Sequence, residues 1–313
     1  MRYIGELRDG EMVSETYLCK TKQSLKTKAG KSYYSLILQD KTGILDAKVW
    51  ELTGGIDHFE AMEYIRVDGQ VVSFQGTLQL NIKRIRRSQE GEYDPSDFVP
   101  TTNKNVDEMY SELLKCISKI QQPHLRKLAE SFFVEDKEFA LRFKKHSAAK
   151  SVHHGFVGGL LEHTLGVVKL CEYYSLNYPM INSDLLITAA IFHDIGKLEE
   201  LSCFPENDYT DDGQLLGHIY IGTEMIGARM RTIPNFPVSL GAQLKHCILA
   251  HHGELEYGSP KKPAMIEALA LNFADNTDAK LQTMTELLNS VDDKTVWLGL
   301  SRLFETNVRR TTI

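Results

Sequence analysis

Histidines and aspartates that could bind a metal ion recur through the second half of the sequence. Several of the histidines interrupt apolar segments, where a buried imidazole without a partner is costly. A single buried histidine is more often a hydrogen-bonded core residue than a ligand, so the prediction depends on the whole set. The candidate ligands are His163, His193, Asp194, His218, His251 and Asp275. Imidazole and carboxylate without thiolate suit a divalent ion that also binds phosphate oxygens, such as manganese, iron, cobalt, nickel or zinc.

The motifs around these residues resemble those of the HD superfamily of metal-dependent phosphohydrolases. In chain order they are GGLLEHTLGV, AAIFHDIGK, GHIYIG, ILAHHGE and NFADNTDAK. The resemblance implies two divalent ions that share Asp194 as a bridging ligand. One ion is expected to be held by His163, His193, Asp194 and Asp275, and the other by Asp194, His218 and His251. A water activated between the ions would attack phosphorus, so no serine or cysteine nucleophile is needed.

Four further residues are candidates for direct contact with a substrate. Lys197 follows Asp194 by one helical turn, and its ammonium could contact a nonbridging phosphate oxygen; the alternative is a solvated surface lysine. His252 is interpreted as a catalytic residue, either as a ligand, a proton donor or a substrate contact. His153 and His154 precede a glycine-rich turn and are predicted to bind the substrate phosphate, with hydrogen bonds to the backbone as the equal alternative.

The first part of the chain has the pattern of a small β-barrel. Five segments alternate apolar and polar residues or are rich in β-branched and aromatic residues, and glycine-containing turns separate them. We expect strands at residues 17–25, 32–40, 44–52, 64–74 and 78–85. Their order and the insertion before the fourth strand resemble an OB-fold.

The remainder of the chain is predicted to be helical. The stretch 91–105 is polar and contains Pro95 and Pro100, which is typical of a linker. Segments with helical periodicity follow it. The predicted organisation is therefore multidomain: an all-β OB-fold-like barrel at 1–90, a linker at 91–105 and an all-α HD domain at 106–313.

Cationic and aromatic residues in the barrel segment favour binding to single-stranded nucleic acid. Stacking on aromatic rings, together with neutralisation of the backbone charge, binds single strands with little sequence preference. The predicted contacts are Lys20, Lys22, Lys83, Arg84 and Arg86, with aromatic residues Tyr33, Tyr34, Trp50, Phe59 and Phe74 interleaved among the basic runs. The alternative is that about half of these aromatics fill the barrel core and that the lysines are solvated.

The order of OB-fold, linker and two-metal HD domain resembles the YhaM-type 3'→5' exoribonucleases of Gram-positive bacteria. This resemblance covers nearly the whole chain. It implies hydrolysis of single-stranded RNA, with single-stranded DNA as a further substrate, to nucleoside 5'-monophosphates. It also implies manganese as the first choice of metal, with cobalt, iron, nickel or zinc as alternatives, and self-association into a homo-oligomer.

Two other functions stay open at this stage. One is an HD phosphohydrolase of a small nucleotide or cyclic dinucleotide, because HHGELEYGSP is similar to part of the HD-GYP signature but lacks its full Gly-Tyr-Pro. The other is a nucleic-acid-binding protein without catalytic activity.

The bulk composition excludes several classes of protein. A hydrophobic share of 42% and a charged share of 25% are those of a folded globular protein. The net charge of -6 means that a polyanion must meet a local basic patch. Five scattered cysteines without a C-x-x-C pair argue against disulfides and a cysteine zinc site. With neither a signal peptide nor an apolar span in the sequence, we expect a cytoplasmic location and no membrane partner.

Overall fold

The computed structural model describes residues 1–52, 54–74, 76–150, 154–289 and 291–312. Within these ranges the chain forms two compact units. The first contains Met1–Thr101 together with Phe204–Glu206, and the second contains Thr102–Cys203 and Asn207–Ile313. Each unit has a hydrophobic core of its own.

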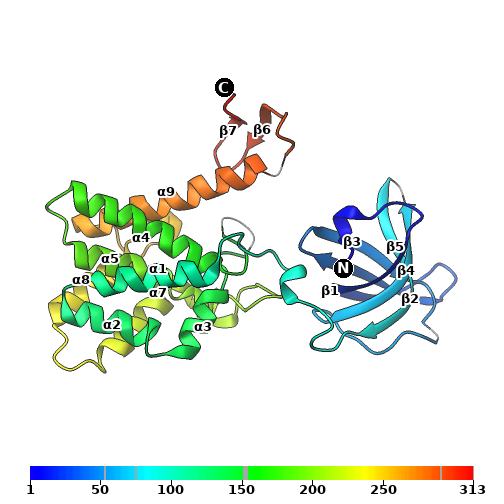
Figure 1. The fold of residues 1–313 in the computed structure, drawn as a ribbon, viewed down its shortest axis with the longest axis horizontal. Helices are drawn as coiled ribbons and strands as arrows, with labels where there is room; N and C mark the ends of the chain where they lie inside the picture. The colour runs from blue at the N-terminus through cyan, green and yellow to red at the C-terminus, as the bar shows by residue number, and fades with distance from the viewer. Residues whose placement is uncertain (53, 75, 151–153, 290, 313) are drawn as a thin grey trace. The chain divides into compact units, whose positions relative to one another are not determined.

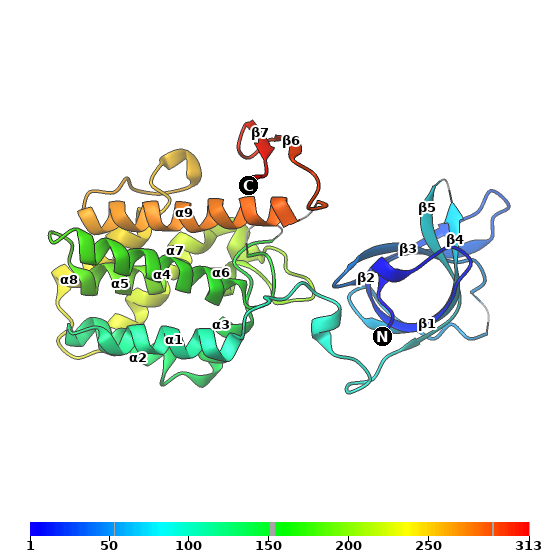
Figure 2. The same cartoon turned by 45° about the horizontal axis from the view of Figure 1, so that its top comes forward.

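The first unit is a closed five-stranded barrel with the strand order β1-β2-β3-β5-β4 (Figures 1 and 2). Its strands are β1 (Met12–Lys26), β2 (Ser32–Asp40), β3 (Gly43–Val49), β4 (Tyr64–Phe74) and β5 (Thr77–Arg87). Neighbouring strands are antiparallel except β3 and β5, which are parallel, with Lys48 opposite Asn81. This order confirms the predicted OB-fold-like barrel.

Side chains alternate between the two faces of each strand, and the apolar face of every strand points into the barrel. Leu36 and Leu38 on β2, Val67 on β4 and Leu80 on β5 are fully buried inside it. Gly69 on β4 lies opposite a bulge in β5, and an added Cβ at this position would stand 2.5 Å from the carbonyl oxygen of Asn81. Only glycine permits that close approach of the two strands.

Part of the stretch expected to be a linker packs on the barrel. Tyr93 and Phe98 form an aromatic cluster with Tyr64, with ring centroids 4.1 to 5.9 Å apart. Between them lies the short 3-10 helix η2 (Pro95–Asp97), where Asp97 accepts hydrogen bonds from Lys41 and from the Tyr3 hydroxyl. These contacts tie the residues after β5 to the first unit.

The second unit is a helical bundle. Its helices are α1 (Val106–Lys119), α2 (Pro123–Phe133), α3 (Lys137–Lys145), α4 (Gly159–Asn177), α5 (Ser183–Phe192), α6 (Lys197–Glu200), α7 (Asp211–Met230), α8 (Val238–Leu249) and α9 (Ile266–Asn289). Asn105, Asp136 and Asn182 cap the starts of α1, α3 and α5 with their side-chain oxygens. The apolar helix α5 lies at the centre, where Leu186, Ala189 and Phe192 are fully buried, and α4 and α9 run side by side over it (Figures 1 and 2).

A hairpin follows α9 and departs from the purely helical prediction for residues 106–313. Strands β6 (Trp297–Ser301) and β7 (Thr306–Arg309) pair antiparallel. The two strands have only five and four residues, which is too few to show a period, so the sequence alone did not distinguish this hairpin from a loop.

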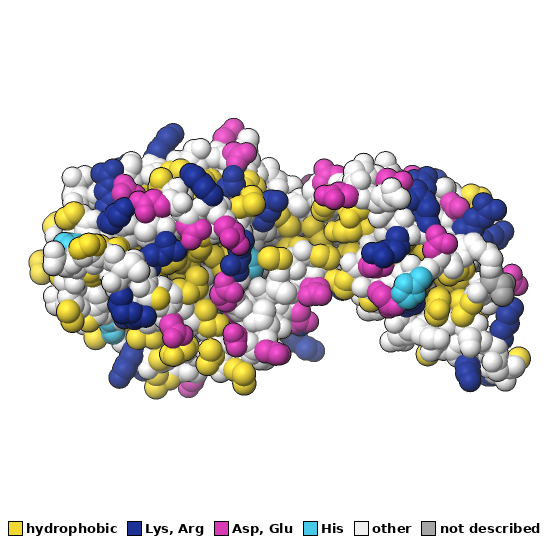
Figure 3. All heavy atoms as spheres, turned by 90° about the horizontal axis from the view of Figure 1, so that it is seen from below, with side chains coloured by type: hydrophobic (Ala, Val, Ile, Leu, Met, Phe, Trp, Pro, Cys, Tyr) yellow, Lys and Arg dark blue, Asp and Glu magenta, His cyan; other side chains and the backbone are white. Residues whose placement is uncertain are grey.

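No helix in the described ranges is long and apolar enough to cross a membrane. On the helical unit, basic and acidic side chains are interspersed over the face shown in Figure 3.

Candidate metal centre

Five helices and turns of the second unit bring the predicted ligands together. His163 lies on α4, His193 and Asp194 lie in the turn after α5, and Asp275 lies on α9. His218 is on α7 and His251 follows α8. Four of these side chains are at most 2% exposed, namely those of His163, His193, Asp194 and His251. Polar groups buried to this degree must be satisfied by one another or by a ligand.

Two glycines allow the elements to approach at this point. At Gly196 an added Cβ would stand 2.0 Å from the carbonyl oxygen of His218, so the turn after α5 packs directly on the backbone of α7. Gly217 has φ of 73° and interrupts α7 just before His218. A residue with a side chain rarely adopts this conformation. The kink therefore sets the direction in which the His218 ring enters the centre.

The first donor group contains His163, His193, Asp194 and Asp275. His163 Nε2 lies 3.1 Å from His193 Nε2 and 3.1 Å from Asp275 Oδ1. Asp194 Oδ2 lies 3.4 Å from both of these imidazole nitrogens. Donor atoms that bind one ion at about 2.0 to 2.2 Å stand roughly 3.0 to 3.5 Å from one another. The spacing of this group therefore fits a single divalent ion.

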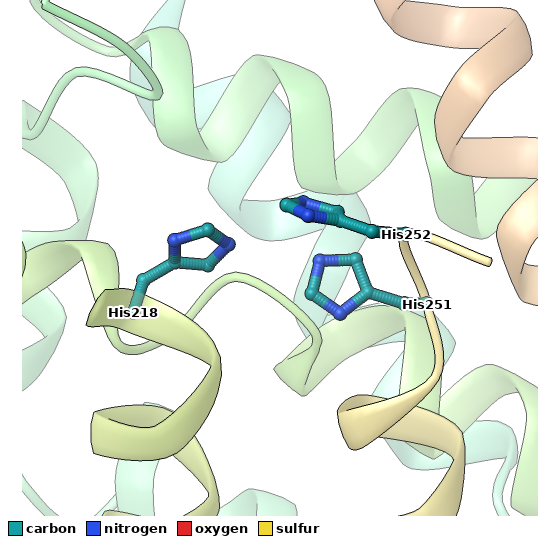
Figure 4. Close-up of side chains that lie close together, drawn as sticks. All are labelled: His218, His251 and His252. Carbon is teal, nitrogen blue, oxygen red and sulfur yellow. The ribbon is translucent and has the colours of Figure 1, made fainter. Parts of the chain in front are cut away.

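The second donor group uses the other oxygen of Asp194. Asp194 Oδ1 lies 3.4 Å from His218 Nε2 and 3.7 Å from His251 Nε2. All three atoms are buried, and none has a hydrogen-bond partner among the described residues. His252 completes a cluster with the two histidines, and the three rings face one another from α7 and from the turn after α8 (Figure 4). This group could also hold a cation.

Hydrogen bonds at the far side of the rings determine which nitrogen faces the centre. The Nδ1 of His193 donates to the carbonyl oxygen of Ala190 at 2.8 Å, and the Nδ1 of His251 donates to that of Ile248 at 2.7 Å. A carbonyl only accepts, so the proton of each neutral ring is on Nδ1 and the lone pair of Nε2 points inward. This is the tautomer that a metal ligand requires.

Carboxylates hold the other two rings in the same way. Asp278 Oδ2 lies 2.7 Å from His163 Nδ1, and Glu200 Oε1 lies 2.9 Å from His218 Nδ1. Glu200 also accepts the backbone N–H of His218 at 2.9 Å. Such outer carboxylates orient metal-binding histidines and increase their basicity. With their Nδ1 atoms engaged outward, all four rings turn Nε2 toward Asp194.

The pKa shifts keep the acidic groups of the centre ionised. Burial alone would raise the pKa of Asp194, but Lys197 and the neighbouring histidines outweigh it and hold the pKa well below its usual range. Burial likewise raises the pKa of Asp275, yet the hydrogen bond from His163 and the nearby imidazoles lower it overall. Burial and the adjacent His252 lower the pKa of His251, which keeps that imidazole neutral. Anionic carboxylates and a neutral imidazole are the forms that bind metal.

Lys197 lies at the edge of the same cluster. Its ammonium is 2.6 Å from Asp194 Oδ2, and its side chain is 13% exposed. Burial lowers the pKa of Lys197, but the attraction of Asp194 outweighs this effect and raises it. A permanently charged ammonium therefore stands beside the two donor groups, where it can meet an anionic ligand.

The remaining predicted substrate contacts in this unit have different environments. His154 is 2% exposed, and its Nε2 lies 3.0 Å from Asp278 Oδ2. It therefore contacts the carboxylate that orients His163, and its burial is unlike that of a side chain open to a phosphate. His153 lies outside the described residues.

Two of the five predicted basic contacts on the barrel are already engaged. The ammonium of Lys22 packs against Tyr34 and Phe59 and donates to the Phe59 carbonyl oxygen. Arg86 makes a bidentate pair with Glu92, at 2.7 and 3.0 Å. The side chains of Lys20, Lys83 and Arg84 are exposed. The structure therefore leaves these three as the accessible cations of the predicted set.

Sequence reasoning missed the two outer carboxylates. Neither Asp278 nor Glu200 is among the residues predicted from the sequence. A usable signal was present for Asp278: it follows Asp275 by three residues, which places both on one face of a helix. The contact of Glu200 with His218 depends on the kink at Gly217 and could not be found from spacing.

The family comparison assigns the region that contains these donors. Residues 160–280 match the family model of the HD domain. The HD domain defines a superfamily of metal-dependent phosphohydrolases, and the matched region includes every member of both donor groups as well as Glu200 and Asp278. The chain therefore combines an OB-fold-like barrel with a helical HD domain.

Solved structures match part of this chain at low identity. The second OB-fold domain of replication protein A from Methanococcus maripaludis matches with 18% identity and a TM-score of 0.24, over 29% of this chain and 98% of that one. A replication protein A heterotrimer bound to single-stranded DNA matches with 16% identity and a TM-score of 0.22, over 27% of this chain and 62% of that one. The p204 HINb domain matches with 18% identity and a TM-score of 0.23, over 27% and 46% of the two chains.

Proposed function

We propose that the protein is a metal-dependent 3'→5' exoribonuclease of the YhaM type, which shortens single-stranded RNA and releases nucleoside 5'-monophosphates. The observation that carries the proposal is the convergence of four imidazole Nε2 atoms on the two oxygens of one buried carboxylate, Asp194. Lone pairs at these distances repel one another unless a cation or a proton lies between them. The donors thus support two divalent ions with Asp194 as their common ligand, manganese being our first choice.

The residues of the chain have distinct parts in this proposal. When bound, two divalent ions supply a water that is deprotonated at neutral pH and stabilise charge on the phosphoryl oxygens. Asp194 offers Oδ2 to the group with His163 and His193, and Oδ1 to the group with His218. Asp278 and Glu200 hold two of the imidazoles in the binding tautomer.

Lys197 and His252 complete the proposed site. The ammonium of Lys197 stands beside the carboxylate that both ion positions share and would neutralise a nonbridging phosphate oxygen as charge develops there. His252 lies on the side of the His218 and His251 rings and is half-buried, so its ring reaches the region where a substrate would enter. We assign it to a fourth ligand position or to contact with the substrate.

The barrel supports a polymeric substrate over a small one. A metal centre of this type alone fits several phosphoesters. A second unit with exposed basic and aromatic side chains favours a substrate that extends beyond the reacting phosphate.

A labelled-RNA assay tests the proposal. Purified protein is incubated in manganese with single-stranded RNA labelled at the 5' or the 3' end, beside Asp194→Ala and a control, Asp293→Ala, whose side chain is 96% exposed. We expect stepwise shortening of the 5'-labelled strand and early release of the 3' label as mononucleotide, with activity lost only in Asp194→Ala. Intact RNA together with hydrolysis of a cyclic dinucleotide would favour a small-nucleotide phosphodiesterase, and binding without turnover would refute catalysis.

A further inference from the structure

An aromatic pair stands on the outer surface of the barrel. The rings of Tyr33 on β2 and Trp50, just after β3, stack with centroids 4.7 Å apart and an angle of 27° between their planes. Trp50 is 43% exposed, although a large aromatic side chain is normally buried where it can be. Its indole Nε1 donates to Asn81 Oδ1 on β5 at 3.0 Å. Contacts from two neighbouring strands therefore hold an exposed indole in one orientation.

The structure separates this pair from the other aromatics of the barrel. Phe59 is 1% exposed, and Tyr34 packs edge-on against it, so both belong to the core. Phe74 is 57% exposed but lies at the turn between β4 and β5. Phe74 pairs with Thr77 at the start of β5, whereas Trp50 contacts Asn81 near the middle of that strand.

The charge around the pair is positive. Residues 17–34, which include Tyr33, contain five lysines and no acidic residue, and residues 77–87 contain four basic residues and no acidic residue. Lys48 is opposite Asn81 in the sheet, and Lys83, two residues further along β5, has an exposed side chain at the bulge of that strand. Lys31 is 64% exposed and reaches Glu51, the residue after Trp50, at 3.7 Å. An anionic backbone could therefore pass close to the rings.

We infer that Tyr33 and Trp50 form a stacking platform for a nucleobase of single-stranded RNA, with Lys31 and Lys83 beside the phosphates. The inference rests on the proposed substrate and names the surface of the barrel that would hold it. A fixed, exposed indole flanked by cations favours a ligand that is flat and apolar on one part and anionic on the next. A single-stranded nucleic acid has both properties in every nucleotide.

The two tryptophans of the chain permit a direct test. Trp297 lies in the C-terminal hairpin, so Trp297→Phe leaves Trp50 as the sole tryptophan emitter in the full-length protein. We expect a 12-nucleotide RNA, added in EDTA to prevent metal-dependent cleavage, to quench this emission in a saturable way. An oligomer of the same length built from abasic sugar phosphates carries the charge without bases and should quench far less.

Variants then test whether the stack contributes affinity. Because stacking on one aromatic side chain is worth about 1 to 3 kcal/mol per base, Trp50→Ala should weaken RNA binding at least about fivefold. Trp50→Phe should retain most of the affinity. Phe74→Ala removes an even more exposed aromatic side chain, at the turn between β4 and β5, and should leave the affinity unchanged. Thermal unfolding of each variant shows whether a loss comes from the barrel itself.

The results separate this inference from the proposed activity. The platform would be overturned if RNA bound without changing Trp50 emission and Trp50→Ala kept the full affinity. Equal binding of RNA and the abasic oligomer would also overturn it. Both outcomes count even if the enzyme degrades RNA. Conversely, a saturable Trp50 signal in EDTA supports the platform even if no 3'→5' shortening occurs in manganese. Absence of any RNA binding refutes the inference.

Discussion

Asp278 offers the sharpest test of how the metal centre is organised. Its Oδ2 accepts hydrogen bonds from His163 Nδ1 at 2.7 Å and from His154 Nε2 at 3.0 Å, and it contacts only the first donor group. Asp278→Asn preserves the shape of the side chain but removes its charge, and its amide can offer only one acceptor oxygen. Loss of such an outer carboxylate weakens metal binding about 10- to 100-fold. This corresponds to about 1.4 to 2.8 kcal/mol at the ion position that uses His163.

Titration of the metal-free protein with manganese, followed by calorimetry, measures this effect without any substrate. We expect two binding steps in the unmodified chain, only one of which weakens in Asp278→Asn. Glu200→Gln should weaken the other step, because Glu200 orients His218 in the second group. Glu162→Gln is a matched control: Glu162 is also buried and directly precedes His163, but its carboxylate pairs with Lys104 and Thr102 and with no ring of the centre.

The reasoning would be refuted if Asp278→Asn and Glu200→Gln weakened the same step or if neither changed manganese affinity. A single binding step in the unmodified protein would remove the assignment of two separate donor groups. Equal losses in Glu162→Gln would show that any change of charge near α4 acts on the centre, so that the hydrogen bond to His163 is not the cause.

Three further predictions concern stability and the division of labour between the units. Gly196→Ala places a Cβ against the His218 carbonyl oxygen. It should therefore lower the free energy of unfolding by about 1 to 3 kcal/mol in urea titrations. Gly227→Ala should not lower it, because the added Cβ meets the flexible end of Lys245. Manganese should raise the thermal midpoint of the unmodified protein but not of Asp194→Ala, since a ligand stabilises only the state that binds it; equal shifts in both would contradict the assigned centre. A chain that begins at Thr101 should hydrolyse a small phosphodiester at an unchanged rate yet bind long RNA more weakly, and equal RNA affinity would show that the barrel does not contribute.

The fold was largely predictable because its signals are local. The apolar and polar alternation of β5 and the apolar run of α5 each specify an element without reference to the rest of the chain. The predicted barrel followed by a helical HD domain is accordingly confirmed. The hairpin of β6 and β7 was not found, because five and four residues are too few to establish a period.

The structure brings the predicted candidate ligands together, but their hydrogen-bonding partners were not predicted from the sequence. The types and order of the histidines and aspartates already indicated a divalent ion, because imidazole and carboxylate have a defined preference for such ions. Which nitrogen of each ring faces inward depends on acceptors such as the Ala190 carbonyl oxygen, on the same helix, and Asp278, on another. The same limit applies to Lys22. The sequence predicted a nucleic-acid contact for its ammonium, but in the structure this ammonium packs against the Phe59 ring and donates to the Phe59 carbonyl oxygen.

The sequence by itself therefore indicated a set of candidate donors and determined the succession of a β-rich and a helical unit, since composition and periodicity are properties of the chain. Only the tertiary structure decided that Asp194 presents one oxygen to each donor group, that Glu200 and Asp278 orient two of the rings, and that Trp50 remains exposed while Phe59 is buried. These features depend on distances between residues far apart in the chain, and such distances exist only once the helices and strands have packed.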